Sequence, residues 1–362
     1  MNYYQQDGIH SPVTGGRGTE ELENFAPSIT VNIPIDSSRT LNLDGGVDFY
    51  SSASSDNIDN PYNDPGHISG ASARDERTYV NAKYTIKNAQ WEYGFLLGSS
   101  FEWDVFSYSG GISLGLNSED NNRGVQFTAK YFYDDWKLIY PIEFRNGQNE
   151  FLDTDIRHSI NSSIVFNANI SRKLSASIAA DYIVQSGLLS TPFHRVYFQG
   201  ATDATIEMLP DNRQKYPFGL RVNYHINETF ILRTFFRYYA DSWGLTGNTA
   251  EITVPIKISQ TFRIYPFYRY HDQGAADYFA PFQVHTGIEE FYTSDFDLST
   301  FESHKYGLGI SYAPLYGLGR FKYSKDKVAL IKSLDLRVTQ YDRSDGLTAT
   351  MGTLGFQINF KR

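Results

Sequence analysis

Alternation of apolar and polar residues along most of the chain is the feature that most constrains its fold. Between residues 213 and 226, the apolar face carries Tyr216, Phe218, Leu220, Val222, Tyr224 and Ile226. The residues between them are mostly basic or amide. The pattern recurs over residues 229–241, 246–258, 261–272 and 346–360. Because successive side chains of a strand point to opposite faces, the pattern predicts an all-β protein.

A soluble β-sandwich would show the same alternation, but two features favour a membrane barrel. The polar face carries many charged and amide groups, which a dry core would not tolerate unpaired. The connections are also asymmetric, with tight turns such as residues 36–38 and 259–260 at one rim. Long connections span residues 53–74, 134–155, 187–212 and 273–302. Short turns at one rim and long loops at the other are typical of outer-membrane barrels.

We therefore predict one domain over residues 1–362, a closed antiparallel transmembrane β-barrel with short periplasmic turns and long extracellular loops. About sixteen strands are expected, and roughly fourteen or eighteen also fit the pattern. The strands are expected at residues 1–6, 22–34, 39–52, 75–86, 90–102, 104–117, 123–134, 156–170, 173–186, 213–226, 229–241, 246–258, 261–272, 303–315, 332–343 and 346–360. The uncertainty in strand number comes from the first strand and from residues 136–145, which alternate too.

Aromatic residues make up 16 % of the chain, and many fall where strands should meet lipid headgroups. The stretches expected near the outer rim are residues 91–103, 131–136, 235–243 and 265–270. Aromatic girdles of this kind flank the apolar band of a membrane barrel. A closed barrel also satisfies all backbone groups in lipid. The expected location is the bacterial outer membrane, as an integral protein in contact with the lipid bilayer.

Composition excludes several classes of function. The chain has no cysteine, which rules out a disulfide scaffold, a thiolate zinc site and an iron–sulfur cluster. Its net charge of -9 argues against a nucleic-acid partner. The eight histidines are scattered, and no nucleophile, base and orienting group converge in the sequence. We therefore expect neither an enzyme nor a cofactor.

Several segments are similar to those of a known family. They are residues 3–7 (YYQQD), 10–16 (HSPVTGG), 186–198 (SGLLSTPFHRVYF), 237–244 (RYYADSWG) and 275–279 (AADYF). The chain resembles an uncharacterised family of bacterial outer-membrane β-barrel proteins, known as a domain of unknown function, in a form typical of Bacteroidota. The resemblance covers most of the chain. It implies a fold and a location, and no settled activity.

One wall of the predicted lumen is basic. Between residues 213 and 271 the inward face carries Arg213, Lys215, Arg221, Arg233, Arg237, Lys257, Arg263 and Arg269. Only two acids, Asp241 and Glu251, share that face. Since Arg and Lys rings select anions, this wall favours a porin-like channel or transporter for small, anion-leaning solutes. The alternative is a ladder of Arg–carboxylate pairs in a non-conducting barrel, a subunit of a larger outer-membrane complex.

The connection 273–302 is rich in acidic and aromatic residues and contains no Lys or Arg. Its acids include Asp277, Glu289, Glu290, Asp295 and Asp297. Folding inward would pair these acids with the basic wall and bury the rings. We therefore predict that this extracellular loop constricts or plugs the pore.

Three further features have functional interpretations. The periplasmic turn 315–332 is basic, and Arg320, Lys322, Lys325 and Lys327 could contact a periplasmic protein; the alternative is a solvated turn. Residues 47–64 offer oxygen ligands for Ca²⁺, among them Asp56, Asp59 and Asp64, but match no EF-hand, so a solvated loop is the main interpretation. Arg195, Glu207, Asp211 and Arg213 are expected to form an ion-pair network that pins the 187–212 loop.

Overall fold

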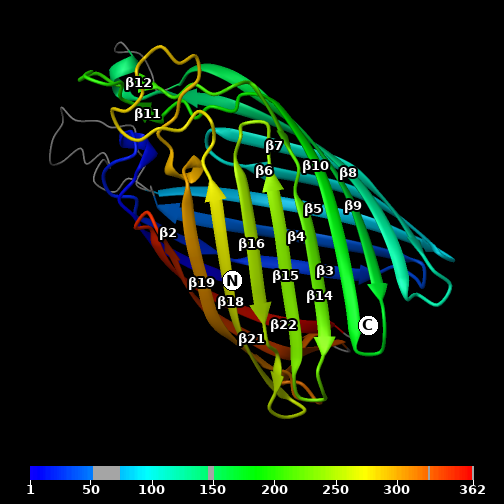
Figure 1. Cartoon of the computed structure of the whole chain (residues 1–362). Coiled ribbons are helices and arrows are strands. Elements are labelled where there is room, and N and C mark those ends of the chain that lie inside the picture. The colour runs from blue at the N-terminus through cyan, green and yellow to red at the C-terminus, as the bar shows by residue number, and fades with distance from the viewer. Residues whose placement is uncertain (52–73, 146–150, 325–326, 361–362) are drawn as a thin grey trace.

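The computed structural model describes residues 1–51, 74–145, 151–324 and 327–360, and strands dominate it (Figure 1). Short 3-10 helices lie at η1 (Pro12–Thr14), η3 (Ile142–Phe144) and η4 (Phe296–Leu298). None of the helices in these residues is long and apolar enough to cross a membrane.

The strands form one large antiparallel sheet and one small hairpin. The large sheet contains β1 (Asn2–Asp7), β2 (Leu22–Ala26), β3 (Ser28–Pro34), β4 (Arg39–Ser51), β5 (Arg74–Asn88), β6 (Trp91–Phe101), β7 (Val105–Asn117), β8 (Arg123–Ile139), β9 (Phe151–Asn169), β10 (Leu174–Gly187), β13 (Asn212–Lys215), β14 (Phe218–His225), β15 (Ile231–Ala240), β16 (Thr246–Thr253), β17 (Ile256–Lys257), β18 (Phe262–Gly274), β19 (Phe301–Tyr312), β20 (Gly319–Ser324), β21 (Lys327–Arg343) and β22 (Thr348–Phe360). The hairpin consists of β11 (Arg195–Val196) and β12 (Thr205–Ile206).

The large sheet closes on itself because β1 pairs with both β2 and β22. Four pairs among its 20 strands each follow a single line along the barrel. Both members of such a pair bond to the same edge of one neighbouring strand. These pairs are β2 with β3 on β4, β13 with β14 on β10, β16 with β17 on β18, and β19 with β20 on β21. The barrel therefore has 16 strands around its circumference, which confirms the predicted architecture.

Proline accounts for three of the four interruptions. Pro27, Pro217 and Pro255 have no backbone N–H to donate to a neighbouring strand. Their carbonyls still accept hydrogen bonds from the neighbour: Val47 N bonds Pro27 O at 3.1 Å, Asp181 N bonds Pro217 O at 2.9 Å, and Ile231 N bonds Pro255 O at 3.1 Å. The predicted strands 22–34, 213–226 and 246–258 thus remain continuous barrel strands despite their prolines.

Two segments differ from the sequence prediction. Residues 136–145 add no strand pair: β8 continues through Ile139, and the chain then turns into η3. The 315–332 turn is mostly a hairpin, because β20 pairs with the first residues of β21 and lengthens the barrel wall at that end. Arg320 and Lys322 lie on β20, and Lys327 begins β21. Lys325 lies outside the described residues.

The two ends of the barrel differ in their connections. Tight connections at residues 35–38, 89–90, 118–122, 170–173, 226–230 and 258–261 lie at one end. Residues 8–21, 188–211 and 275–300 lie at the other, together with β11 and β12 (Figure 1). Because short turns face the periplasm in outer-membrane barrels, the second end is extracellular.

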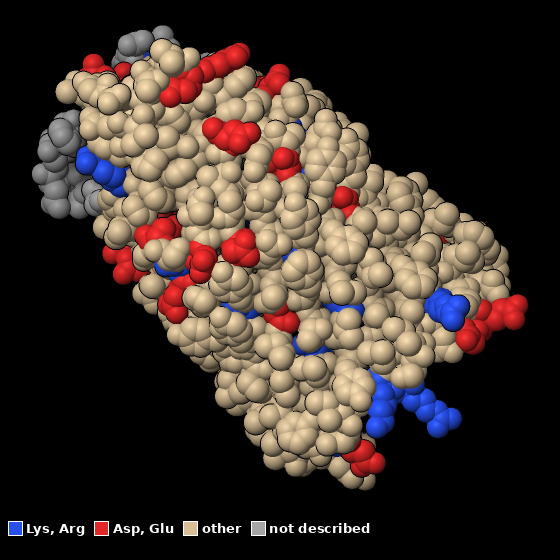
Figure 2. Space-filling view, in the orientation of Figure 1, with Lys and Arg blue, Asp and Glu red and all other residues tan. Residues whose placement is uncertain are grey.

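The outer wall is apolar. The side chains of Leu97, Val80 and Ile112 point away from the lumen and are 68 %, 54 % and 57 % exposed. Uncharged residues dominate the visible wall of the barrel (Figure 2). Tyr131 and Tyr268 face outward, as the girdle prediction requires, at 44 % and 42 % exposed. A closed barrel with such a wall is suited to lipid.

The girdle prediction was wrong for three tryptophans. Trp91 begins β6 and lies at the periplasmic end. On β8, Trp136 lies an odd number of residues from the outward-facing Tyr131, so its side chain faces the lumen. The guanidinium of Arg157 lies over its ring. Trp243 is 3 % exposed, because it lies in the β15–β16 connection and packs beneath the extracellular loops.

Candidate functional site: the lumen wall and its extracellular cap

The alternation on β13 to β18 places all eight predicted basic residues on the lumen side. The intervening residues Phe218, Phe236 and Tyr268 are 42 % exposed on the outer face. On β17, Lys257 pairs in register with Arg263 and so shares its side of the sheet. Asp241 and Glu251 share the inner face, so the structure brings the predicted set together along one wall.

Two of these cations have carboxylate partners. The Arg213 Nε lies 2.8 Å from Asp241 Oδ2, and the Asp241 side chain is 0 % exposed. Asp241 also accepts hydrogen bonds from the Tyr239 hydroxyl and the Trp243 backbone N–H, at 2.8 and 2.9 Å. The Arg269 Nη2 lies 2.6 Å from Glu251 Oε2. These pairs stabilise the wall, and the first of them anchors its extracellular end.

Of the other cations, some have their charged groups over aromatic rings, and the rest project into the lumen. Arg221 lies 5.2 Å from the ring centre of Phe235, and Arg237 lies 5.8 Å from that of Tyr239. Within the described part of the chain, no carboxylate lies within ion-pair distance of Arg221, Arg233, Arg237, Lys257 or Arg263. Their positive charge therefore remains available to a solute in the lumen.

Three cations outside the predicted set extend this wall onto β19 and β21. Lys305 lies directly opposite Arg269, and the guanidinium of Arg337 lies 3.8 Å from the ring centre of Phe267. The Arg337 Nε is buried, and none of the residues that the structure describes gives it a hydrogen-bond partner. Arg343 lies at the extracellular end of β21. The signal was present, because the same alternation over residues 303–312 and 334–343 points these side chains inward.

The opposite wall has a modest excess of acids. The inward positions of β4, β5 and β6 include five acids, Asp44, Asp48, Asp75, Glu92 and Glu102. Three cations, Arg77, Lys83 and Lys87, share the inward face of β5. Arg77 Nε lies 3.5 Å from Glu102 Oε1, and Lys87 Nζ lies 3.3 Å from Glu92 Oε2. Since these strands lie across the closed barrel from β15 to β18, the lumen has a basic side and an acidic side.

The three long connections pack together over the extracellular end, and we call residues 8–21, 188–211 and 275–300 the cap. Leu209 and Ala276 of the cap, the latter from the predicted plug loop, form an apolar core with Trp243 and Leu245 of the β15–β16 connection. His10 stacks on Phe296 with ring centres 3.7 Å apart. Arg17 lies 3.6 Å from the ring centre of Phe282. The loop is thus ordered by contacts with its neighbours.

The acids of the plug loop do not pair with the predicted basic wall. Glu289 accepts backbone N–H groups of its own turn, at Thr286 and Gly287, which lowers its pKa to about 2. Asp277 and Glu290 are exposed. Asp297 alone reaches a lumen cation, and that cation is Arg343, with 2.6 Å between Nη1 and Oδ1. The expected charge pairing therefore occurs at one point, on a residue outside the predicted set.

Arg343 fastens the loop to the barrel. Its side chain is 6 % exposed and donates to the Phe296 carbonyl at 3.0 Å, in addition to pairing with Asp297 and Asp345. Its guanidinium also lies 4.0 Å from the ring centre of Phe301. Arg343 thereby holds the end of the plug loop at the top of the lumen wall.

Beneath this contact lies a cavity of about 470 Å³. Its lining comes from the inner faces of β1, β16, β18, β19, β21 and β22, and includes Arg269 and Lys305. Glu20 and Asp297 of the cap also line it. Burial is the main cause that raises the pKa of Glu20 to about 7, and Asp297 adds to the rise. The cap thus places titratable acids directly above lumen cations.

The predicted ion-pair network of the 187–212 loop has different partners. Arg195 pairs with Glu143 of η3, with 2.5 Å between Nε and Oε1, and not with Glu207. Glu207 instead faces His194 and Asp295. Arg213 pairs with Asp241, as described above. The loop is pinned, but by residues from distant segments that the sequence spacing could not indicate.

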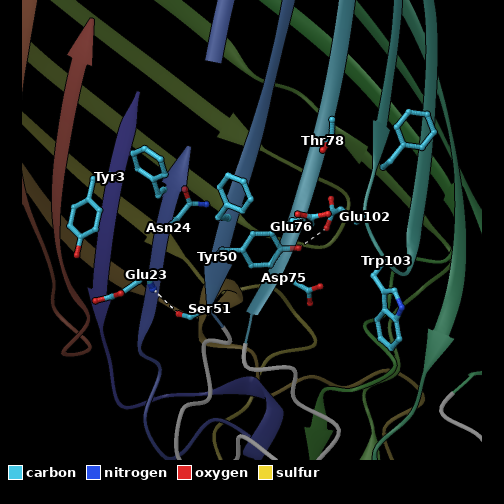
Figure 3. Close-up of a pocket in the computed structure, with 13 residues that line it drawn as sticks. Tyr3, Glu23, Asn24, Tyr50, Ser51, Asp75, Glu76, Thr78, Glu102 and Trp103 are labelled. Carbon is cyan, nitrogen blue, oxygen red and sulfur yellow. Dashed lines mark hydrogen bonds between the residues drawn. The ribbon is translucent and has the colours of Figure 1, made fainter. Parts of the chain in front are cut away.

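A second cavity, of about 960 Å³, opens at the extracellular rim between β1, β2, β4, β5 and β6 (Figure 3). It combines outward side chains such as Tyr3 and Trp103 with inward ones such as Tyr50. The Tyr50 hydroxyl donates to Glu102 at 2.9 Å. The cavity is acidic, because Glu23, Asp75, Glu76 and Glu102 line it. Asp56, Asp59 and Asp64, the weak Ca²⁺ candidates, lie outside the described residues.

Comparisons with known proteins identify a family. The sequence profile of a family described as "Protein of unknown function (DUF3570)" matches residues 51–318. No curated protein matches the chain. The bacterial group suggested by the sequence is not addressed by this match and stays a prediction.

Several solved structures are similar to this chain at low sequence identity. The siderophore receptor PirA from Pseudomonas aeruginosa is 10 % identical, with a TM-score of 0.47 over 99 % of this chain and 70 % of its own. The outer membrane protein opdK from the same organism is 5 % identical, with a TM-score of 0.43 over 99 % and 97 %. The ferric enterobactin receptor PfeA, also from P. aeruginosa, is 10 % identical, with a TM-score of 0.45 over 94 %. The chain spans 53 % of that receptor, about half its length.

Proposed function

Since the chain belongs to the DUF3570 family of unknown function and is an integral outer-membrane barrel, we propose from its own geometry that it is a porin-like channel or transporter for small anionic solutes. The observation that supports this most directly is the inward face of β14 to β21. Arg221, Arg237 and Lys305 lie there without a carboxylate partner among the described residues. A catalytic role is not part of the proposal.

The register of the wall adds a physical reason for an anion. Arg269 and Lys305 lie directly opposite each other on β18 and β19. Like charges in this position destabilise a sheet, by an amount on the order of 0.2–1 kcal/mol. Glu251 forms its ion pair with Arg269, so one carboxylate serves two cations. An anion bound or passing between these side chains would offset the remainder, as in pores whose Arg and Lys rings select anions.

A second candidate function is supported by the cap. The loops that form it share a buried core, and Arg343 fastens one of them over the lumen. A barrel closed in this way would serve as a non-conducting subunit of a larger outer-membrane complex. The two candidates differ in whether the capped lumen passes ions.

The test is single-channel conductance of the purified chain in a planar bilayer, with a salt gradient to read selectivity from the reversal potential. Heat-modifiable gel migration shows first that the barrel is folded. We expect an anion-selective conductance that loses at least half of its selectivity in the double variant Arg237→Gln with Lys305→Gln. The control is Arg172→Gln, which removes a cation from a periplasmic turn and leaves the lumen unchanged.

Selectivity for cations, or anion selectivity that the double variant retains, would contradict the channel proposal. Folded protein that passes no current, both as the wild type and after release of the loop by Arg343→Gln, would favour the non-conducting subunit. Proteins that co-purify from gently solubilised membranes would then identify the complex.

A further inference from the structure

Three metal-ligating side chains meet inside the cap. His194 and Glu207 flank the β11–β12 hairpin, which is extended by a hydrogen bond from Glu207 N to His194 O at 3.0 Å. Asp295 comes from the plug loop, where it caps η4. The ligand atoms of the three side chains all lie within 4.8 Å of one another. Residues far apart in sequence therefore present one nitrogen and two oxygens to a common point.

The distances suit an ion between these groups better than direct contacts. The His194 Nδ1 lies 3.4 Å from Glu207 Oε2 and 4.0 Å from Asp295 Oδ2. A charge-assisted hydrogen bond between a ring N–H and a carboxylate would be about 2.7–2.9 Å long. Two ligands of a tetrahedral ion, each about 2.1 Å from it, would be about 3.4 Å apart.

Neighbouring groups orient the two carboxylates. Glu207 Oε1 accepts from the Thr191 backbone N–H at 2.8 Å, and Oε2 accepts from the Thr293 hydroxyl at 2.5 Å. Asp295 Oδ1 accepts from the Asp297 N–H at 2.9 Å, which leaves Oδ2 facing His194. Fixed outer partners of this kind are characteristic of metal ligands.

The charge of the cluster also calls for a cation. The side chains of His194, Glu207 and Asp295 are 13 %, 2 % and 21 % exposed, so water offers the two carboxylates limited solvation. One imidazole can balance at most one of them. Two arginines close to these residues are engaged elsewhere: Arg195, next to His194 in the chain, pairs with Glu143, and Arg343, which bonds the Phe296 carbonyl, pairs with Asp297 and Asp345. Buried carboxylates are stable when paired or bound to a metal.

We propose that His194, Glu207 and Asp295 bind one divalent transition-metal ion, best matched by Zn²⁺, with water completing its coordination. Such a site would join the 188–211 connection to the plug loop and hold the cap together. Ca²⁺ and Mg²⁺ fit less well, because they prefer more oxygen ligands and no imidazole. The inference does not depend on whether the barrel conducts.

The test is calorimetric titration of the full-length chain, purified without an oligohistidine tag and treated with EDTA, using ZnCl₂ as the probe. We expect one Zn²⁺ per chain, and an affinity at least ten-fold lower in His194→Gln and in Asp295→Asn. Asp203→Asn, at an exposed position of the same hairpin connection, is the matched control and should bind as the wild type does. Absence of binding by the wild type, or equal binding by all variants, would overturn the proposal.

Wild-type protein alone supplies a second measurement that does not depend on how the variants fold. X-ray absorption at the zinc edge should show a single imidazole and otherwise oxygen ligands. Zinc should also slow proteolysis within the plug loop, which is anchored at Asp295. Two or more imidazoles at the zinc, or unchanged proteolysis on saturation, would contradict the assignment.

Discussion

Gly309 makes room for an aromatic ring on the inner wall of the barrel. The ring of Tyr265, on the neighbouring strand, occupies the position that a Cβ at residue 309 would take. Phe267 and Gly307 repeat the arrangement one step along the same strands. The rings thus lie against the wall and cover it, and one of them supports the guanidinium of Arg337.

We expect Gly309→Ala to destabilise the barrel by about 1–3 kcal/mol, because the Tyr265 ring must leave its position. Urea unfolding in lipid vesicles measures this change. Gly352→Ala is the matched control, because nothing lies within 4 Å of a Cβ at that position. Removing the ring as well, in Gly309→Ala with Tyr265→Ala, should show a non-additive gain. Equal stability of the two single variants would contradict the packing argument.

Glu20 makes the cap sensitive to pH. Burial raises the pKa of Glu20 to about 7; Asp297 and Asp295 add to the rise, whereas Arg343 and Gln6 oppose it. The folded cap therefore favours the protonated carboxyl. Its contribution to stability is complete below the unfolded pKa of 4.5 and is lost as the pH rises through about 7.

We expect the 8–21 segment to be better protected from hydrogen exchange at pH 5 than at pH 8. The difference should be about 1–2 kcal/mol after allowance for the partial exposure of the carboxyl. Glu20→Gln removes the titration and should make protection nearly independent of pH over this window. A pH dependence that survives in the variant would show that another group is responsible.

At the scale of the elements, the alternation of residues was sufficient to place a strand at each position around the barrel. It succeeded even across Pro27, Pro217 and Pro255, because a proline carbonyl can continue the ladder without its N–H. It failed at residues 315–332, where a basic composition suggested a turn and the chain forms the β20–β21 hairpin instead. Pairing with a neighbouring strand, not local composition, decides the structure of such a segment.

The cap could be predicted as a set of long loops but not in its contacts. The acidic composition of the 273–302 connection suggested pairing with the basic wall. Instead, Glu289 bonds its own turn, and Asp295 faces a histidine about one hundred residues away. Loop acids are satisfied by whichever partners the fold brings near, and these partners have no period in the sequence.

Replacing Arg343 tests how the plug loop is held against the barrel. We expect Arg343→Gln to free the 296–301 end of the loop, because it removes the ion pair with Asp297 and weakens the contact with Phe296. In a conducting barrel this should raise the single-channel conductance two-fold or more. Arg233→Gln is the control, because it removes a lumen cation that does not contact the loop. A larger current in the control than in Arg343→Gln would contradict the role of Arg343 as the fastening.

At the scale of the whole molecule, the net charge of -9 conceals an uneven distribution. Acids gather in the loops and on the inward faces of β4 to β6, whereas cations gather across the lumen on β14 to β21. A solute in the lumen would therefore meet a field directed across the barrel, which orients charged molecules as well as attracting them. The alternation in the sequence identifies the basic wall, but only the closed barrel places the acidic wall opposite to it.

In a membrane, the stability cost of an added charge depends on its depth. This cost should therefore differ between the outer wall and the periplasmic rim. Leu97 lies near the middle of β6 and points outward, whereas Leu315 follows β19 at the periplasmic end. Both side chains are widely exposed, at 68 % and 77 %, so in water neither Leu→Arg change would be costly. In a bilayer, Leu97→Arg would place a charge near the hydrocarbon midplane and should cost about 2–4 kcal/mol.

Leu315→Arg, in contrast, should change stability by less than about 1 kcal/mol, because the charge stays near the interface. Unfolding by urea in lipid vesicles measures both variants under the same conditions. Equal costs would mean that the apolar wall does not face hydrocarbon, because only a bilayer makes two equally exposed leucines respond differently to the same charge.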